Sequence, residues 1–176
     1  MSERTVRVSG GDLVLREFGP EDETDLLAAF TDPEIARWNP QATDAASVSV
    51  WASARNDWTI GEHTSWAVGD AGGRLVGSVS LHKIDLEQGD AELGYWVAPW
   101  ARRRGVAVRA ATAATAYGFN ALGLHRVHLF HATENRASCA VAGLAGFLLE
   151  GRLRQSYRYA DGVHHDEHLH ARLVTD

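Results

Sequence analysis

The sequence has few of the features that mark several large protein classes. Its 176 residues contain one cysteine, Cys139, so no disulfide can form within the chain, as is typical of a reducing compartment. No window approaches 18 uninterrupted apolar residues, so we expect no transmembrane helix and no membrane partner. The N-terminus lacks the apolar core of a signal peptide, and we therefore expect a cytoplasmic protein.

Positive charge is also scarce. Seventeen Lys and Arg residues stand against 23 Asp and Glu residues, a formal net charge of -6, and Lys83 is the only lysine. This balance argues against nucleic-acid binding, which needs a broad basic face. It is compatible with a cationic partner such as an amine.

What remains is ordinary for one globular domain, with 45% hydrophobic and 23% charged residues. We find no repeat, low-complexity tract or linker, so residues 1–176 are predicted to form a single domain. Apolar alternation and turn-rich breaks predict strands over 12–19, 64–70, 73–85, 90–99, 123–132 and two in 152–174. Helix starts and composition predict helices over 20–30, 44–58, 105–119 and 135–147. This order predicts a mixed α/β or α+β domain.

Three consecutive arginines, Arg102 to Arg104, stand between the strand over 90–99 and the helix that follows. Gly105 would let backbone approach a ligand closely, and the next N–H groups would open a helix whose dipole favours anions. Strand, glycine loop and helix start together predict a phosphate-binding site. The alternative is a solvated basic loop that caps the helix.

The same loop, Arg102-x-x-Gly105-x-Ala107, resembles the Gln/Arg-x-x-Gly-x-Gly/Ala signature of the GNAT family of N-acetyltransferases. The segments 91–99, 123–135 and 135–147 are similar to that family's fourth strand, fifth strand and next helix, in its order. The segment 12–40 resembles the entry of the RimJ/RimL-like branch, which acetylates ribosomal-protein N-termini. The resemblance therefore covers nearly the whole chain.

The resemblance implies a GNAT fold: a mostly antiparallel sheet of about seven strands, splayed between strands 4 and 5 and flanked by about four helices. It implies direct acetyl transfer from acetyl-CoA, with no metal, to a primary amine in a ternary complex. The cofactor residues that it implies lie on the fourth strand, the loop and the next helix: Val97, Ala98, Arg102, Arg103, Arg104, Gly105, Val106, Ala107, Asn135 and Ser138. Asn135 can equally be read as the cap of the helix that follows it.

Glu92 is our candidate for the general base. Strand alternation places it on one face with Gly94 and Trp96, and apolar neighbours would raise its pKa towards a useful value. The alternative is an exposed glutamate at a sheet edge.

The leaving thiolate has no obvious proton donor. The family's tyrosine, seven residues after Asn135, is replaced by Ala142, which can do no proton chemistry. Ser138 is the nearest substitute; its alternative role is a hydrogen bond to backbone in the first helical turn.

Three tryptophans, Trp38, Trp51 and Trp58, fall in the region that forms the acceptor groove in the family. They are candidates for substrate binding, and core packing is the alternative for each.

Two other features suggest chemistry that we do not assign. His164, His165, His168 and His170 resemble a metal site, but His164 and His168 would lie about 13 Å apart on a strand, too far to share an ion. We expect surface histidines and no metal. Cys139 lies in an apolar helical run and is predicted to be a buried structural residue.

The sequence therefore predicts an N-acetyltransferase acting on a protein or peptide N-terminal α-amine. A small-molecule amine (an antibiotic, a polyamine or an amino acid) and a non-catalytic acyl-CoA sensor remain open as alternatives. Members of the branch occur as monomers and homodimers.

Overall fold

The alternating segments of the sequence do form strands, and all of them belong to one sheet. In the computed structural model, which describes residues 4–8 and 10–176, eight strands pair in the order β1-β2-β3-β4-β5-β6-β8-β7. They are β1 (Val6–Arg7), β2 (Leu13–Arg16), β3 (His63–Asp70), β4 (Leu75–Asp85), β5 (Asp90–Val97), β6 (Arg126–Ala132), β7 (Leu148–Arg158) and β8 (His164–Leu173). The strand beyond the seven expected is β1, which is only two residues long.

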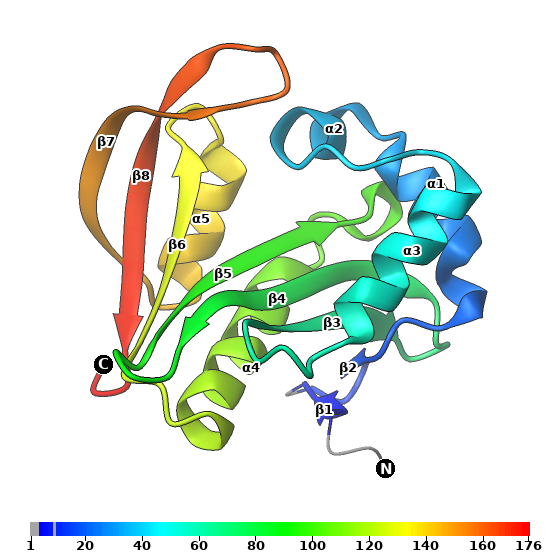
Figure 1. Cartoon of the computed structure of the whole chain (residues 1–176), viewed down its shortest axis with the longest axis horizontal. Coiled ribbons are helices and arrows are strands. Elements are labelled where there is room, and N and C mark those ends of the chain that lie inside the picture. The colour runs from blue at the N-terminus through cyan, green and yellow to red at the C-terminus, as the bar shows by residue number, and fades with distance from the viewer. Residues whose placement is uncertain (1–3, 9) are drawn as a thin grey trace.

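Five α-helices cover the sheet within the described part of the chain (Figure 1). They are α1 (Glu23–Phe30), α2 (Pro33–Trp38), α3 (Ala45–Asn56), α4 (Val106–Ala121) and α5 (Arg136–Leu144). The helix beyond the four expected is α2. It begins because Asp32 accepts hydrogen bonds from the backbone N–H groups of Glu34 and Ile35, and Pro33 occupies its first position. Across residues 4–8 and 10–176, no helix has both the length and the apolar character needed to cross a bilayer.

The sheet is antiparallel except where β5 meets β6. These two strands pair in parallel over three residues only, from Asp90 beside Arg126 to Glu92 beside His128. Beyond that point β5 continues to Val97 and β6 to Ala132 without pairing with each other, and Figure 1 shows the two strands diverging. The predicted mixed α/β fold and its splayed sheet are confirmed.

Two apolar clusters hold helices against opposite faces of the β3–β4–β5 region. On one face α4 packs through Ala110, Ala111 and Ala114, each at most 2% exposed. On the other face, Phe30 of α1 contacts the ring of Trp96 on β5. The alanine-rich helix is therefore a tightly packed element, because its small side chains let its backbone lie close to the sheet.

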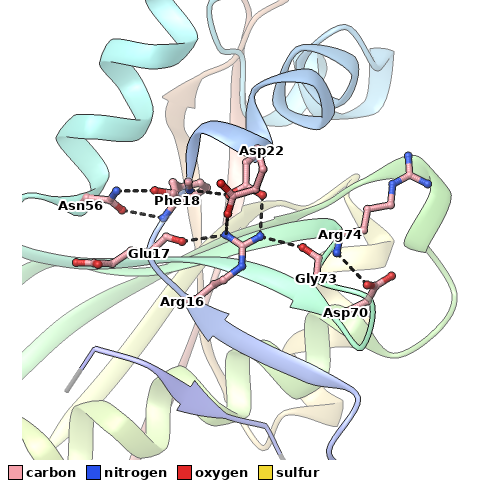
Figure 2. Close-up of polar contacts among 10 residues, drawn as sticks. Arg16, Glu17, Phe18, Asp22, Asn56, Asp70, Gly73 and Arg74 are labelled. Atoms are coloured by element: carbon pink, nitrogen blue, oxygen red, sulfur yellow. Dashed lines mark hydrogen bonds and ion pairs between the residues drawn. The ribbon is translucent and has the colours of Figure 1, made fainter. Parts of the chain in front are cut away.

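A partly buried ion pair joins the segment before α1 to the sheet (Figure 2). Arg16 on β2 donates to both carboxylate oxygens of Asp22 at 2.7 Å and to the carbonyl of Gly73 at 3.1 Å. Asn56, at the end of α3, exchanges two hydrogen bonds with the backbone of Phe18. Bidentate arginine–carboxylate pairing fixes geometry as well as charge, so these contacts orient α1 and α3 over the sheet.

Candidate functional site

A groove opens where β5 ends and α4 begins. Gly105 caps α4 in the left-handed conformation, with φ of 71°. A Cβ atom there would meet nothing within 4 Å, so the glycine is required by its backbone conformation and not by crowding. The first N–H groups of α4 have no partner within the helix, and they make this loop an anion-binding position.

The groove has a volume of about 360 Å³ and collects most of the predicted cofactor residues. Those that line it are Val97, Arg102, Arg103, Gly105, Val106, Ala107, Asn135 and Ser138. Arg102 is also ion-paired with Asp32, the cap of α2, so the loop before α4 and helix α2 hold each other in place.

Two predicted cofactor residues lie elsewhere. Ala98 is fully buried, and its N–H donates to the carbonyl of Val76 at 3.0 Å, so it has no N–H to offer a ligand. Arg104 faces a separate small pocket beside Asp12. Neither residue lines the groove, so both assignments are corrected: the Ala98 N–H is already bonded to the neighbouring strand, and Arg104 lines the separate pocket.

A larger cavity of about 710 Å³ lies on the other side of the splay. Its floor is one face of β3, β4 and β5, formed by Ser65, Ser78, Ser80, His82, Glu92, Gly94 and Trp96. Several polar atoms in its lining are buried without a hydrogen-bond partner among the described residues: Trp51 Nε1, Ser65 Oγ, Tyr95 OH and Trp96 Nε1. Buried polar atoms are normally paired, so these atoms indicate that the cavity accommodates a polar ligand or water.

The groove and the cavity meet at one place. Six residues line both: Trp38, Asn39, Tyr95, Trp96, Asn135 and Ser138. The Oδ1 atom of Asn135 accepts a hydrogen bond from the backbone N–H of Ser138 at 3.0 Å, so its role as a helix cap is confirmed. That cap places the Ser138 side chain at the junction of the two spaces.

Tyr95 is a functional candidate that the sequence analysis missed. Alternation puts it on the opposite strand face from Glu92, but β5 has lost its neighbour β6 here, and Tyr95 borders both spaces. Burial raises the pKa of Tyr95 to about 12, against a lowering effect of nearby Ser138. The phenol therefore stays protonated at neutral pH and can donate a hydrogen bond.

Glu92 lies in the cavity, but its environment differs from the prediction. Burial alone would raise its pKa, yet hydrogen bonds and charge from His82 and Lys83 lower it to about 2. Oε1 lies 3.2 Å from His82 Nε2, and Oε2 accepts from Lys83 Nζ at 2.7 Å. The expectation of a raised pKa was wrong, and Glu92 is a firmly ionised carboxylate.

The reason is a break in the alternation of β4. The register shifts between His82 and Asp85, and Lys83 adopts a positive φ of 51°. In a regular strand, His82 and Lys83 would point to opposite faces, whereas this bulge lets both reach Glu92. Gly94 leaves room for the imidazole, since a Cβ there would lie 2.9 Å from His82 Cε1.

The three candidate tryptophans have different surroundings. Trp38 and Trp51 line the cavity, and Trp51 also packs edge-on against Phe18. Trp58 packs instead against Trp66 in the core below α4 and does not line the cavity. Its assignment to the acceptor groove is therefore corrected to core packing.

Two further charged residues of the cavity escaped sequence analysis. Glu167 on β8 accepts hydrogen bonds from Ser156 and from Tyr159, each at 2.9 Å. Arg55 on α3 has no carboxylate partner in the described ranges and lies over the Trp51 ring at 5.2 Å. No local signal marks either residue, because the fold brings them in from distant elements.

The histidine-rich strand also differs from expectation in part. His164 is exposed at the start of β8, as predicted for a surface histidine. His170 is only 4% exposed and faces α5, so the expectation that this histidine lies on the surface was wrong. Cys139 is half-buried, so the expectation that it is fully buried was wrong.

Comparison with known proteins identifies the family. Residues 12–148 match the Acetyltransferase (GNAT) domain family. YdaF of Bacillus subtilis (strain 168), whose name gives ribosomal N-acetyltransferase as a provisional assignment, is 39% identical over 53% of this chain and 51% of YdaF. The chain thus spans about half the length of that relative. The uncharacterized N-acetyltransferase YoaA of the same organism is 28% identical over 90% of this chain and 92% of YoaA.

Other relatives broaden the comparison. Spermidine N(1)-acetyltransferase of Vibrio cholerae is 32% identical over 54% of this chain and 58% of that protein. Among solved structures, Mycobacterium smegmatis RimJ in complex with CoA-disulfide superposes with a TM-score of 0.86. It is 24% identical, covering 97% of this chain and 86% of RimJ, so this likeness concerns the fold alone.

Proposed function

This chain belongs to the GNAT family of N-acetyltransferases, and from that premise we propose that it acetylates the free α-amine of a protein or peptide N-terminus. The donor is acetyl-CoA, and transfer is direct, within a ternary complex. One observation carries the proposal: the groove beside α4 and the cavity over β3–β5 meet at Tyr95 and Ser138. A donor in the first space and an acceptor in the second would come into contact there.

The groove suits coenzyme A. The α4 N-terminus and the backbone of Gly105 to Ala107 would hold the pyrophosphate, with the exposed Arg103 assisting at the charged end. Val97 would border the pantetheine arm. When bound, acetyl-CoA supplies the thioester carbonyl that the amine attacks and the thiolate that leaves.

The acceptor needs a neutral nitrogen. An α-amine has a pKa of about 7.7–8, so a useful fraction is neutral near neutral pH without a strong base. With its pKa near 2, Glu92 is a weak base, and we assign it to orient His82 and to hold the amine or a water. We assign His82, which lines the cavity beside Glu92, to receive the proton from the amine.

Two hydroxyl groups lie where the thiolate of the donor would leave. Ser138 and Tyr95 can donate hydrogen bonds to the thioester carbonyl or to the sulfur as negative charge develops there. A thiol has a pKa of about 8.5, so the thiolate leaves without complete proton transfer. This accounts for Ala142, which is fully buried and takes no part in proton transfer.

Arg55 favours a peptide acceptor. Burial lowers its pKa, and it lacks a carboxylate partner in the part of the chain that is described. A peptide presents a carbonyl next to its α-amine, which a guanidinium can bind. A polyamine would instead bring additional positive charge towards Arg55 and Lys83, which disfavours the polyamine alternative.

A panel of acceptors tests the proposal. Thiol release from acetyl-CoA would be followed with four acceptors. The first is a peptide with a free N-terminus, and the second is the same peptide with its N-terminus blocked and with an internal lysine. The third is a free amino acid, and the fourth is spermidine. We expect turnover with the free peptide alone, and a higher KM for that peptide in Arg55→Ala. Turnover with spermidine or an amino acid but no free peptide would overturn the acceptor assignment, and CoA binding with no turnover at all would favour a sensor.

A further inference from the structure

Three histidines and the single cysteine converge at the interface between α5 and the β6–β8 pair. They are His131 on β6, His168 and His170 on β8, and Cys139 on α5. One nitrogen from each histidine and the sulfur of Cys139 all lie within 4.8 Å of one another. His131 and His170 are each only 4% exposed.

Strand register explains how the cluster forms. His131 is the direct cross-strand partner of His168, and Leu129 is the partner of His170. His168 and His170, two residues apart, point to the same face of the sheet as His131. Helix α5 crosses that face, and Cys139 lies in its second turn. Sequence spacing along β8 could not reveal the cluster, because two of its four members come from other elements.

The imidazoles are already oriented as ligands. His131 Nδ1 lies 2.8 Å from the carbonyl of Ala132 and donates to it, which leaves Nε2 unprotonated and facing the cluster. That Nε2 lies 3.2 Å from Nε2 of His170. Metal-binding histidines characteristically donate their second N–H to a backbone carbonyl, as His131 does.

Two ring nitrogens of the cluster have no partner in the part of the protein that the structure describes. His168 Nδ1 and His170 Nδ1 are buried without a hydrogen-bond partner among the described residues. Buried polar atoms are normally paired, so the protein alone does not satisfy the cluster.

We propose that His131, Cys139, His168 and His170 form a binding site for a zinc ion. Three imidazoles and a thiolate match the nitrogen and sulfur ligands that zinc prefers, and they exclude magnesium and calcium, which require oxygen ligands. Four protein ligands leave no open position, so the site is structural.

Binding a zinc ion would require the four ligand atoms to move only slightly closer together. In a tetrahedral site with Zn–N of about 2.0 Å and Zn–S of about 2.3 Å, ligand atoms are separated by roughly 3.3–3.7 Å. The two Nε2 atoms are already 3.2 Å apart, and the longest separation has to close from at most 4.8 Å. Rotation of the Cys139 and His168 side chains can supply that movement.

The ion would connect α5 to the sheet beside the junction. Ser138 precedes Cys139, and His131 lines the acceptor cavity. Zinc would therefore hold the first turns of α5 against β6 and β8. The proposal does not depend on the acceptor or on catalysis.

Cobalt spectroscopy on untagged, chelator-treated full-length protein tests the site. We expect Co²⁺ to bind in a 1:1 ratio, with a thiolate charge-transfer band and intense tetrahedral d–d bands, and Zn²⁺ to displace it and raise the Tm. Cys139→Ser should lose the charge-transfer band, and His168→Ala should weaken Zn²⁺ affinity by more than about 10–100-fold, the cost of losing an outer-shell partner.

His164→Ala is the matched control, since it removes an exposed histidine from the same strand, and it should bind as the wild type does. An octahedral Co²⁺ spectrum without the thiolate band in the wild type would overturn the proposal, even if a variant failed to fold. So would unchanged Zn²⁺ affinity in folded Cys139→Ser and His168→Ala.

Discussion

The two spaces that meet at Ser138 are built in different ways. The groove beside α4, our proposed donor site, draws much of its lining from one contiguous stretch, Val97 to Val108, in which a glycine with positive φ ends a loop and starts a helix. The cavity over β3–β5, our proposed acceptor site, takes its lining from strands and helices spread between Trp38 and Glu167. In the proposed assignment, a short motif therefore specifies donor binding, whereas acceptor choice depends on the whole fold.

The largest effect that we expect is a loss of coenzyme A binding on substitution of Gly105 in the groove. Gly105→Glu would force a side chain into a left-handed conformation and place a carboxylate where the pyrophosphate should bind. Since opposing like charges cost several kcal/mol, the Kd for coenzyme A measured by calorimetry should rise by more than about 100-fold.

Gly123→Glu is the control for that substitution. Gly123 follows the other end of α4 and has a φ of 68°, and a Cβ atom added there would also meet nothing within 4 Å. The substitution imposes the same backbone strain far from the groove. Equal loss of binding in both variants would show that strain, and not the anion site, is responsible.

On the cavity side, Glu92→Gln should change the pH dependence of stability. The pKa of Glu92 falls from an ordinary 4.5 to about 2 on folding, so its ionisation contributes about 3 kcal/mol above pH 4.5. That contribution is lost as pH falls from 4.5 towards 2. The variant should thus be less stable at pH 7 and should approach the wild type in acid.

Urea unfolding at a series of pH values measures this difference. Glu87→Gln, at an exposed position, is the control and should follow the wild type throughout. A constant difference between wild type and Glu92→Gln from pH 7 down to pH 3 would contradict the ion-pair account.

Two tryptophans separate acceptor binding from packing. Trp51→Phe should raise the KM for a peptide acceptor several-fold, because Trp51 lines the cavity with an unpartnered Nε1. Trp58→Phe should lower the free energy of unfolding by about 1–2 kcal/mol, through loss of ring contacts and of its hydrogen bond to the Arg55 carbonyl. Reversed effects on KM and stability would exchange the two roles.

The smallest effects that we expect are changes in coenzyme A binding on substitution of the arginines between β5 and α4. Arg103→Ala should weaken coenzyme A binding about two- to five-fold, the cost of losing one exposed charge contact. Arg104→Ala should leave binding unchanged, since Arg104 lies outside the groove. Competition binding with both variants measures the loss of coenzyme A affinity in each. If the three arginines act only through a general positive field, the two variants should lose affinity equally, and this result would contradict the assignment of individual contacts.

Local sequence patterns predicted most of the secondary structure. Seven of the eight strands, four helices and the cap at Asn135 follow from alternation, breakers and capping residues. The short helix α2 was missed, although Asp32, Pro33 and Glu34 form a typical helix start. Here the signal was present in the sequence and was not used.

Other features could not be predicted from local pattern. The low pKa of Glu92 depends on a bulge in β4 that lets the Lys83 side chain reach Glu92. Regular strand alternation would have placed Lys83 on the opposite face of the sheet. The cluster around Cys139 depends on the register of β6 with β8. In both cases, long-range pairing decided which side chains meet.

The central claim is that donor and acceptor meet at the junction lined by Tyr95 and Ser138. A conjugate that joins coenzyme A through an acetyl linker to the α-amine of a peptide would occupy both spaces at once. We predict a Kd at least about 100-fold lower than that of coenzyme A, as expected for two linked binding sites. A conjugate that binds no more tightly than coenzyme A would contradict the account.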